Sequence, residues 1–377
     1  IYTMNPKIDN YTVDNNTLKF TLSGVDVSFA NAIRRIILSE IPIVGFKTLP
    51  YEQNKCNITA NTSRLNNEII KQRLSCIPVH ITDLTIPLNN YILEIDEENK
   101  TDTIMMITTE HFKVRNTSTN TYLEKHEVRK IFPPFIPSTG KGEYFIEFAR
   151  LRPTISPEIP GEKLKLTCEF SIVSAKEDSM FNVASTCSYG FTVDKEAGQR
   201  ELAKLEQKWR DEGKTKEEAE FEAKNWLLLE ANRYTIKNSF DFNIQTVGIY
   251  ESSQLVSMAC SILIKKFEEL KTMVTNDQVK IEKSVSTIDN CYDITLENEN
   301  YTVGNILNFI VYNQFYSNTK ILNYCGFKKM HPHDPDSLMR VGFNQTTETK
   351  DSVREMLIYS CDEANKVFRE VKERFLK

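Results

Sequence analysis

Residues 28–42 read SFANAIRRIILSEIP and predict a helix of about four turns. Apolar residues recur three and four positions apart, as on one face of a helix: Phe29, Ile33, Ile36, Ile37 and Ile41. Ser28 can accept the amide hydrogens of the first turn, and Pro42 ends the helix at the residue before it. The larger features of the chain are organised around this stretch.

The second face of the predicted helix combines charge with apolar surface. Asn31, Arg34, Arg35 and Leu38 lie together there, while apolar residues extend nearly all the way round the helix. In one interpretation the helix is buried between its own core and another chain, where the guanidinium groups meet carboxylates or carbonyls of the partner. In the other it is a core helix whose two arginines reach past the core to water. Periodicity alone leaves both open.

The same pattern recurs at residues 301–310, YTVGNILNFI. A hydroxyl residue, a small residue and an asparagine again precede an apolar run, and Asn305 aligns with Asn31. An alternating strand precedes each copy, with these apolar residues: Leu18, Phe20 and Leu22 before the first, and Tyr292, Ile294 and Leu296 before the second. Two such units in one chain predict an internal pseudo-dimer.

A long amphipathic helix follows each copy, and the two helices are expected to pair the halves. Ser252 or Ser253 can cap the first, and Thr349 can cap the second. Their apolar faces supply the expected intrachain dimerisation residues: Leu255, Met258, Ile262 and Phe267 on the first, and Met356, Leu357, Val367 and Phe368 on the second.

These residues carry a resemblance to a known family. Residues 27–42 resemble the signature helix of the alpha-type subunits of multisubunit DNA-directed RNA polymerases. NTSRLNNEIIKQRLSCIPV at 61–79 is similar to the block that follows this helix in the third subunit of eukaryotic polymerase II and in its archaeal D-like counterpart. GEKLKLTC at 161–168 and AKED at 175–178 match later segments of the same third-type polypeptide. Residues 300–332 resemble the eleventh-type polypeptide and its archaeal L-like counterpart.

The resemblance covers nearly the whole chain and implies a third-type and an eleventh-type subunit fused end to end. It associates this arrangement with large DNA viruses that encode their own polymerase. The expected fold is α+β, an alpha-type polymerase dimerisation fold that forms an intrachain pseudo-dimer with an inserted β-rich domain. The expected domains are 1–49 and 235–275 for the first dimerisation domain, 50–234 for the β-rich insertion, and 276–377 for the eleventh-type (L-like) dimerisation domain.

Two segments of the expected insertion carry candidate partner contacts. Residues 65–74 predict a short helix in which Glu68 and Arg73 are five apart, so they lie on different faces and must find other partners. The resemblance places this segment near the junction with a large catalytic subunit, whereas a solvated helix is the alternative. Residues 194–229 predict a charged helical hairpin whose second helix is capped by Thr215. Its charges fit either a solvated face or a partner site.

Composition narrows the class of protein. A chain of 377 residues with 40% hydrophobic content can bury a sizeable core, and a net charge of -5 gives no general attraction to nucleic acid. No apolar run approaches the roughly twenty residues that span a bilayer, and residues 1–10 lack a signal-peptide core. We therefore expect a soluble, intracellular protein. The 8 cysteines include no Cys-x-x-Cys pair and are expected to be reduced, mostly buried thiols.

The chemistry of catalysis and of metal binding is not indicated by any motif. The sequence has no Asp-x-Asp-x-Asp triplet and no phosphate-binding glycine loop, so we expect no catalytic residues and no cofactor. The HPHDPD run at 331–336 fits a turn stiffened by prolines better than a metal site. Third-type subunits often hold a metal in the inserted domain, but residues 78–166 contain no cysteine, and we expect no metal here.

The function that the resemblance implies is that of a non-catalytic assembly platform, to which the second-largest and largest polymerase subunits and small zinc-binding subunits bind. No direct sequence-specific nucleic-acid contact and no membrane contact are expected, and the location would be the host cytoplasm and virion if viral, otherwise the nucleus. The expected subunit interface consists of Asn31, Arg34, Arg35, Leu38, Glu68, Arg73, Asn305, Leu307 and Phe309. The alternatives are a free-standing homodimeric scaffold and a nucleic-acid-binding protein.

Overall fold

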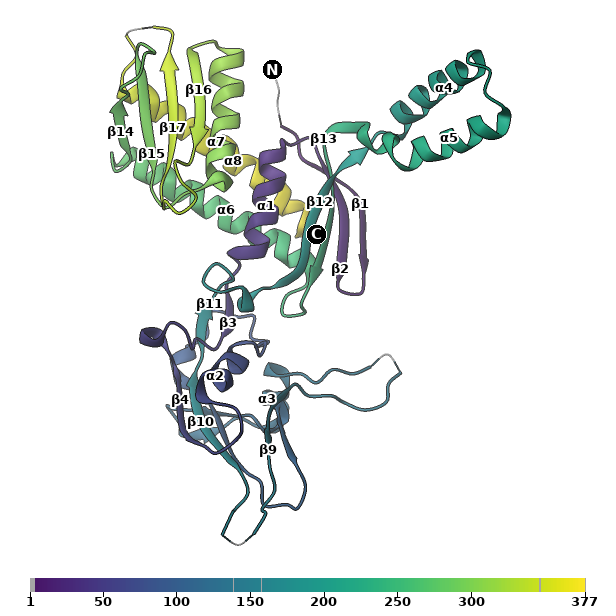
Figure 1. Ribbon diagram of the computed structural model, residues 1–377. Helices are drawn as coiled ribbons and strands as arrows, with labels where there is room; N and C mark the ends of the chain where they lie inside the picture. The colour runs from purple at the N-terminus through teal and green to yellow at the C-terminus, as the bar shows by residue number, and fades with distance from the viewer. Residues whose placement is uncertain (1–3, 138, 157, 346, 377) are drawn as a thin grey trace. The chain divides into compact units, whose positions relative to one another are not determined.

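The computed structural model describes residues 4–137, 139–156, 158–345 and 347–376 (Figure 1). The chain forms two compact units. The first unit comprises the described residues of Ile1–Ile37, Ala184–Gln245 and Ser252–Lys377, and the second comprises those of Leu38–Val183 and Thr246–Glu251.

The first unit consists of two halves with the same order of elements. The elements of the first half are β1 (Lys7–Asp14), β2 (Thr17–Ser23), α1 (Val27–Ser39), β12 (Ala184–Val193), β13 (Thr235–Thr246) and α6 (Ser252–Thr275). The elements of the second half are β14 (Lys280–Lys283), β15 (Cys291–Leu296), α7 (Tyr301–Val311), β16 (Leu322–Lys328), β17 (Ser337–Phe343) and α8 (Lys350–Phe375).

The strand order of the two halves is also the same. One sheet runs β1-β2-β13-β12 and the other runs β14-β15-β17-β16, so the helix that follows the second strand and the helix that ends the half occupy equivalent positions in each. The strands predicted before each helix are present, and their alternating residues are buried, for example Leu18 and Ile294. The predicted α+β fold and its internal duplication are confirmed.

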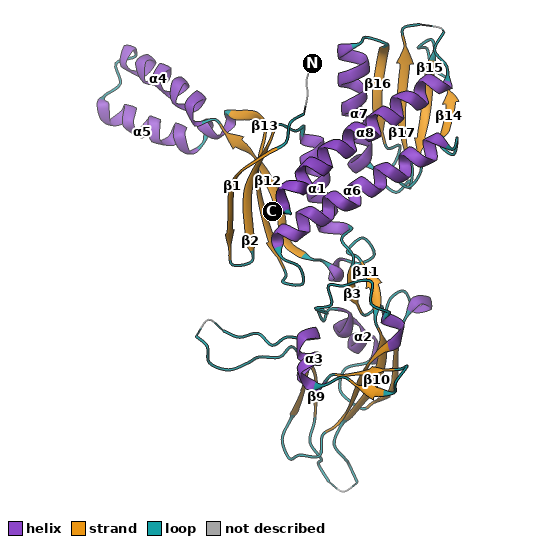
Figure 2. Cartoon of the chain, turned by 180° about the vertical axis from the view of Figure 1, so that it is seen from behind, coloured by secondary structure: helices purple, strands orange, loops and turns teal. Residues whose placement is uncertain are grey.

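The two halves meet through their helices. The long helices α6 and α8 lie side by side in both views (Figures 1 and 2). Phe368 of α8 packs against Phe29 of α1 and Phe267 of α6, with ring centroids 5.2 and 6.1 Å apart, and all three side chains are fully buried. Both long helices also carry polar faces.

Among the residues that the structure describes, none of the helices combines the length and the apolar character that a membrane span requires.

Ion pairs between α6 and α8 surround this aromatic contact. Lys271 lies 2.7 Å from Asp362, and Arg369 lies 2.8 Å from Glu268. These side chains are largely exposed, so each pair contributes at most about 1 kcal/mol. The apolar contacts therefore dominate the association of the halves.

The second unit is built from small antiparallel sheets around one core. Its five-stranded sheet contains β4 (Cys56–Asn61), β10 (Lys163–Glu169), β5 (Tyr91–Glu98), β7 (Lys113–Asn116) and β8 (Thr121–Tyr122) in that order. The two-stranded sheets pair β3 (Ile43–Gly45) with β11 (Ser171–Val173) and β6 (Met105–Thr108) with β9 (Glu147–Leu151). The helices are α2 (Asn67–Ser75) and α3 (Lys125–Ile131). The core between them is rich in phenylalanine: Phe46, Phe112, Phe132, Phe148 and Phe170.

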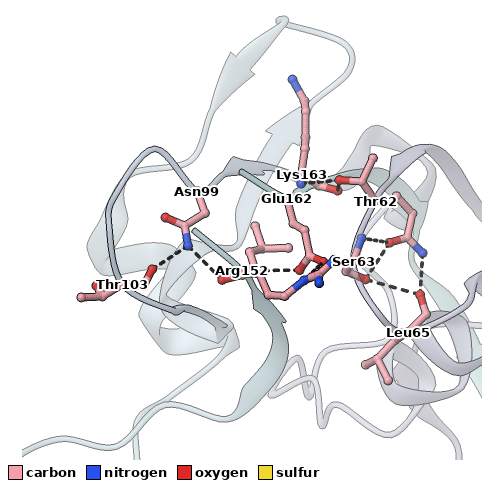
Figure 3. Close-up of polar contacts among 10 residues, drawn as sticks. Thr62, Ser63, Leu65, Asn99, Thr103, Arg152, Glu162 and Lys163 are labelled. Carbon is pink, nitrogen blue, oxygen red and sulfur yellow. Dashed lines mark hydrogen bonds and ion pairs between the residues drawn. The ribbon is translucent and has the colours of Figure 1, made fainter. Parts of the chain in front are cut away.

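Buried polar side chains fix the loops of this unit (Figure 3). The Glu162 carboxylate is buried and accepts hydrogen bonds from the main-chain N and the Nε of Arg152, at 2.7 and 2.5 Å. The buried Asn99 amide donates to the carbonyls of Thr103 and Leu151, at 2.8 and 2.9 Å. Because both of these buried side chains have partners, the loops are held without the cost of unpaired polar atoms.

The remaining short helical turns lie at Tyr51–Gln53, Leu88–Asn90, Thr109–His111, Ser179–Phe181, Glu230–Arg233 and, as a π-helical turn, Tyr312–Asn318.

The units divide the chain differently from the expected domain boundaries of 49 and 234. The predicted hairpin is present as α4 (Lys195–Asp211) and α5 (Lys216–Leu228), and Thr215 and Glu218 form its capping box. It belongs to the first unit and not to the β-rich insertion, because it connects β12 and β13, which are neighbours in one sheet. The insertion itself begins earlier, at Leu38.

The aromatic contact between the halves predicts a large effect of Phe368→Ala. Removing a fully buried phenylalanine should lower the free energy of unfolding of the full chain by about 3 to 5 kcal/mol. Phe221→Ala on the hairpin is the matched control, because Phe221 is 66% exposed and its loss should cost no more than about 0.5 kcal/mol. Urea denaturation measures both values. Equal, small effects would mean that the halves do not depend on this contact.

Candidate functional site

The helices α1 and α7 are capped at their N-termini by the same kind of side-chain hydrogen bond. The Asp26 carboxylate accepts hydrogen bonds from the main-chain N and the Oγ of Ser28, at 2.9 and 2.7 Å. The Asn300 side-chain oxygen accepts from the main-chain N of Thr302 at 2.8 Å. Ser28 was expected to cap α1, but Asp26 supplies the accepting oxygen. Asp26 and Asn300 occupy equivalent positions when Asn31 is aligned with Asn305, so the cap is part of the internal repeat.

A cavity of about 330 Å³ lies where α1, α7 and β12 meet. It brings together three of the predicted interface residues, which come from both copies of the repeat: Asn31, Asn305 and Phe309. The other lining residues are Asp26, Val27, Ser28, Tyr189, Asn308 and Tyr312. We call this set the α1/α7 cavity.

The α1/α7 cavity combines amide groups with aromatic walls. The Asn31 Oδ1 accepts hydrogen bonds from the Nε and Nη2 of Arg34, at 3.1 and 2.9 Å. Within the described part of the chain, the Asn31 amide hydrogens remain for another acceptor. Asn305 is exposed, and no hydrogen bond of its side chain is found within the described part of the chain. Amides that can both donate and accept suit the backbone of a polypeptide, and aromatic residues are enriched at protein interfaces.

Burial raises the pKa of two side chains on β12. Burial raises the pKa of the Tyr189 hydroxyl, with Arg34 opposing the shift and Asp26 adding to it. Burial likewise raises the pKa of the Cys187 thiol to about 12. A phenol is already neutral at physiological pH, and burial reinforces this for Tyr189, the residue of β12 that lines the cavity.

Arg35 makes a contact inside the chain. Its Nε donates a hydrogen bond to the Oγ1 of Thr302 on α7 at 2.8 Å. Arg35 was expected to point towards a partner subunit, but the pseudo-dimer places α7 against it. This hydrogen bond within the chain belongs to neither interpretation of the helix, and contact of the half-buried Arg35 with a partner stays a prediction. Arg34 instead stays on its own helix through Asn31.

The other expected interface residues are dispersed. Leu307 is fully buried within the first unit, which corrects its expected place on a partner surface. Arg73 belongs to the second unit and donates to the main-chain carbonyls of Phe148 and Glu147, at 2.7 and 2.8 Å, so its partner is also internal. Glu68 is exposed in the first turn of α2, and Leu38 is half-buried near the end of α1.

The expected intrachain dimerisation residues lie on α6 and α8. Six of the eight are buried and two are half-buried; the buried ones are Leu255, Phe267, Met356, Leu357, Val367 and Phe368, and the half-buried ones are Met258 and Ile262.

Sequence reasoning missed several residues of the cavity. Asn308 stands at the repeat position of Arg34, so the alignment of Asn31 with Asn305 could have found it. Asp26 could also have been predicted from the sequence, because aspartate is a preferred N-cap residue and lies two positions before Ser28. Tyr189 could not have been predicted from the sequence, because it lies on β12, which only the tertiary fold brings to this surface.

The described residues contain no group of three His, Cys, Asp or Glu side chains that could hold a metal ion. In the HPHDPD run, the rings of His331 and His333 lie 5.0 Å apart, and the Nδ1 of His331 accepts a hydrogen bond from the main-chain N of His333. This nitrogen is engaged in the turn.

The fold defines a class of protein, an α+β protein whose two similar halves pair within one chain. Residues 19–267 match the family described as RNA polymerase Rpb3/Rpb11 dimerisation domain, and the chain belongs to this family. The match begins in β2 and ends in α6, so it spans both units.

Relatives in this family carry polymerase names. The chain is 28% identical over 203 residues to DNA-directed RNA polymerases I and III subunit RPAC1 of Homo sapiens, which covers 50% of this chain and 55% of that protein. It is 40% identical over 79 residues to DNA-directed RNA polymerase subunit Rpo3 of Thermococcus kodakarensis, covering 21% and 26%. The chain spans about half the length, or less, of the curated relatives it matches.

The Arg35 contact predicts energetic coupling between α1 and α7. Arg35→Ala should lower the free energy of unfolding by about 1 to 3 kcal/mol, because Thr302 is buried and loses its charged donor. A double-mutant cycle with Thr302→Val, followed by urea denaturation, should give a coupling energy of about 0.5 to 1.5 kcal/mol. The matched cycle of Arg34→Ala with Thr302→Val should give none. A coupling energy near zero for Arg35 would contradict the contact.

Proposed function

We propose that this protein is a non-catalytic assembly-platform subunit of a DNA-dependent RNA polymerase, to which the second-largest and largest subunits bind. The observation that carries the proposal is the α1/α7 cavity, which is lined by Asn31 from one half and Asn305 from the other in a chain of the Rpb3/Rpb11 dimerisation family. The polymerase names of the relatives support it.

The fusion of the two halves favours a platform role. A surface that combines α1 with α7 otherwise requires two chains to associate first. Here both helices belong to one chain, so the halves are held at high effective concentration and the composite surface exists without a second partner. The proposal therefore includes a third-type and an eleventh-type subunit fused in one chain. Small zinc-binding subunits are proposed as further partners.

The polymerase determines where such a protein works. If the polymerase is that of a large DNA virus, this chain belongs in the host cytoplasm and the virion; otherwise it belongs in the nucleus. A free-standing homodimeric scaffold is the alternative function, because the family is defined by a dimerisation domain. Co-purification separates the two, since a polymerase subunit should elute with two very large chains.

The α1/α7 cavity predicts that Asn305→Arg blocks docking. Asn305 is exposed on α7, so a long charged side chain should fit the isolated protein and leave its Tm within about 2 °C, since exposed substitutions rarely change stability by more than about 0.5 kcal/mol. In the interface it would bury an unpaired charge, and recovery of the complex with co-expressed largest subunits should fall about tenfold or more.

Gln207→Arg on α4 is the matched control, because Gln207 is also an exposed polar helical residue and lies outside the cavity. It should leave recovery unchanged. Recovery of the Asn305 variant at the wild-type level would show that the α1/α7 cavity is not the docking surface.

A further inference from the structure

Two buried cysteines face each other in the second unit. Cys56 on β4 and Cys168 on β10 are direct partners in the antiparallel register. Their side chains are 2% and 0% exposed and belong to the core of the unit. The sequence shows them only as two of 8 scattered cysteines, so the pairing is a product of the fold.

The hydrogen bonds around this pair identify its geometry. The main-chain N of Glu169 donates to the carbonyl of Lys55 at 3.3 Å, so the ladder bond flanks the cysteine pair instead of joining it. The main-chain N and O of Cys56 bond instead to the Asn54 side chain, at 3.1 and 2.9 Å. Cys56 and Cys168 therefore occupy a non-hydrogen-bonded position.

Such positions bring side chains close together. Cα atoms of a non-hydrogen-bonded antiparallel pair lie about 4.5 Å apart, which is within the range of about 4.4 to 6.8 Å that a disulfide spans. A cross-link at this position needs rotation of the side chains and little movement of the backbone.

The electrostatic environment distinguishes the two thiols. A hydrogen bond with Cys168 and the positive charge of Lys71 lower the pKa of Cys56, while burial opposes this shift. The same hydrogen bond, together with burial, raises the pKa of Cys168. Cys56 is thus the thiol that more readily becomes the attacking thiolate.

We propose that Cys56 and Cys168 form a reversible intrachain disulfide, with a small-molecule disulfide such as glutathione disulfide as the oxidant. The Cys56 thiolate attacks one sulfur of the oxidant, whose S–S bond breaks and releases one glutathione thiolate. Cys168 then loses its proton to solvent and attacks the Cys56 sulfur, which releases the second glutathione thiolate. Two protein thiols are oxidised, and one glutathione disulfide is reduced to two glutathiones.

The cross-link stabilises one side of the second unit. Strand β4 is at the edge of the five-stranded sheet, and β10 is its neighbour there among the residues that the structure describes. It continues into the segment that leads to α2, whereas β10 lies inside the sheet. A covalent bond between them closes a loop on the order of 100 residues and limits opening of this edge. Oxidation thus stabilises the unit without adding a partner.

The experiment refolds the full chain from denaturant in a series of glutathione buffers that range from reducing to oxidising. Refolding removes burial as a barrier to the oxidant. Free thiols are then blocked with an alkylating agent under denaturing conditions, and peptide mass mapping locates the disulfides. We expect a peptide pair joined through Cys56 and Cys168, and a rise in Tm of the oxidised protein by about 5 °C or more.

Two variants make the result specific. Cys168→Ala should abolish both the cross-linked peptide and the rise in Tm, whereas Cys76→Ser, which removes an exposed cysteine, should change neither. Alkylation of both Cys56 and Cys168 at every potential would overturn the proposal. So would a cross-link or a mixed disulfide at Cys76 in place of the predicted one. None of these outcomes depends on the proposed polymerase role.

Discussion

The first unit depends on burial of apolar helix faces that neither half covers alone. Phe29, Phe267 and Phe368 come from α1, α6 and α8, and they pack on one another across the two halves. Burying one such side chain is worth about 1.5 to 3 kcal/mol, which exceeds the value of the exposed ion pairs around it. The surface that the two halves form together therefore persists only while this core stays packed. A partner that recognises α1 and α7 at once recognises the paired state.

This core also explains why the chain tolerates two insertions. The second unit is inserted between α1 and β12, and the hairpin of α4 and α5 is inserted between β12 and β13. Both enter at connections between elements, so the strand order of the first half stays identical to that of the second half, which has neither insertion. The second unit has its own core around Phe148 and its own satisfied polar loops.

The sequence was a good guide to features with a local period and a poor guide to contacts between distant segments. The four main helices and the duplication were predictable, because amphipathic spacing and the alignment of Asn31 with Asn305 are visible in the chain. The direction of Arg35 was not, since periodicity places a side chain on a face and cannot say that Thr302 will stand opposite it. Leu307 was misplaced for the same reason. The two helices of the hairpin were predicted correctly. The unit to which the hairpin belongs was not, because it depends on the pairing of the strands β12 and β13.

The two halves of the first unit have the same order of elements but differ in sequence, and the candidate site shows this divergence. When Asn31 is aligned with Asn305, Arg35 is equivalent to Phe309 in the repeat, and Ala30 is equivalent to Gly304. A Cβ at Gly304 would lie 2.0 Å from the Phe327 ring, so α7 packs more tightly on its own sheet at this point than an alanine allows. Arg35 in turn reaches across to α7, whereas the equivalent Phe309 lines the α1/α7 cavity. A homodimer would present each of these features twice, related by its two-fold axis. In this chain the two halves contribute different residues, so the α1/α7 cavity lacks two-fold symmetry.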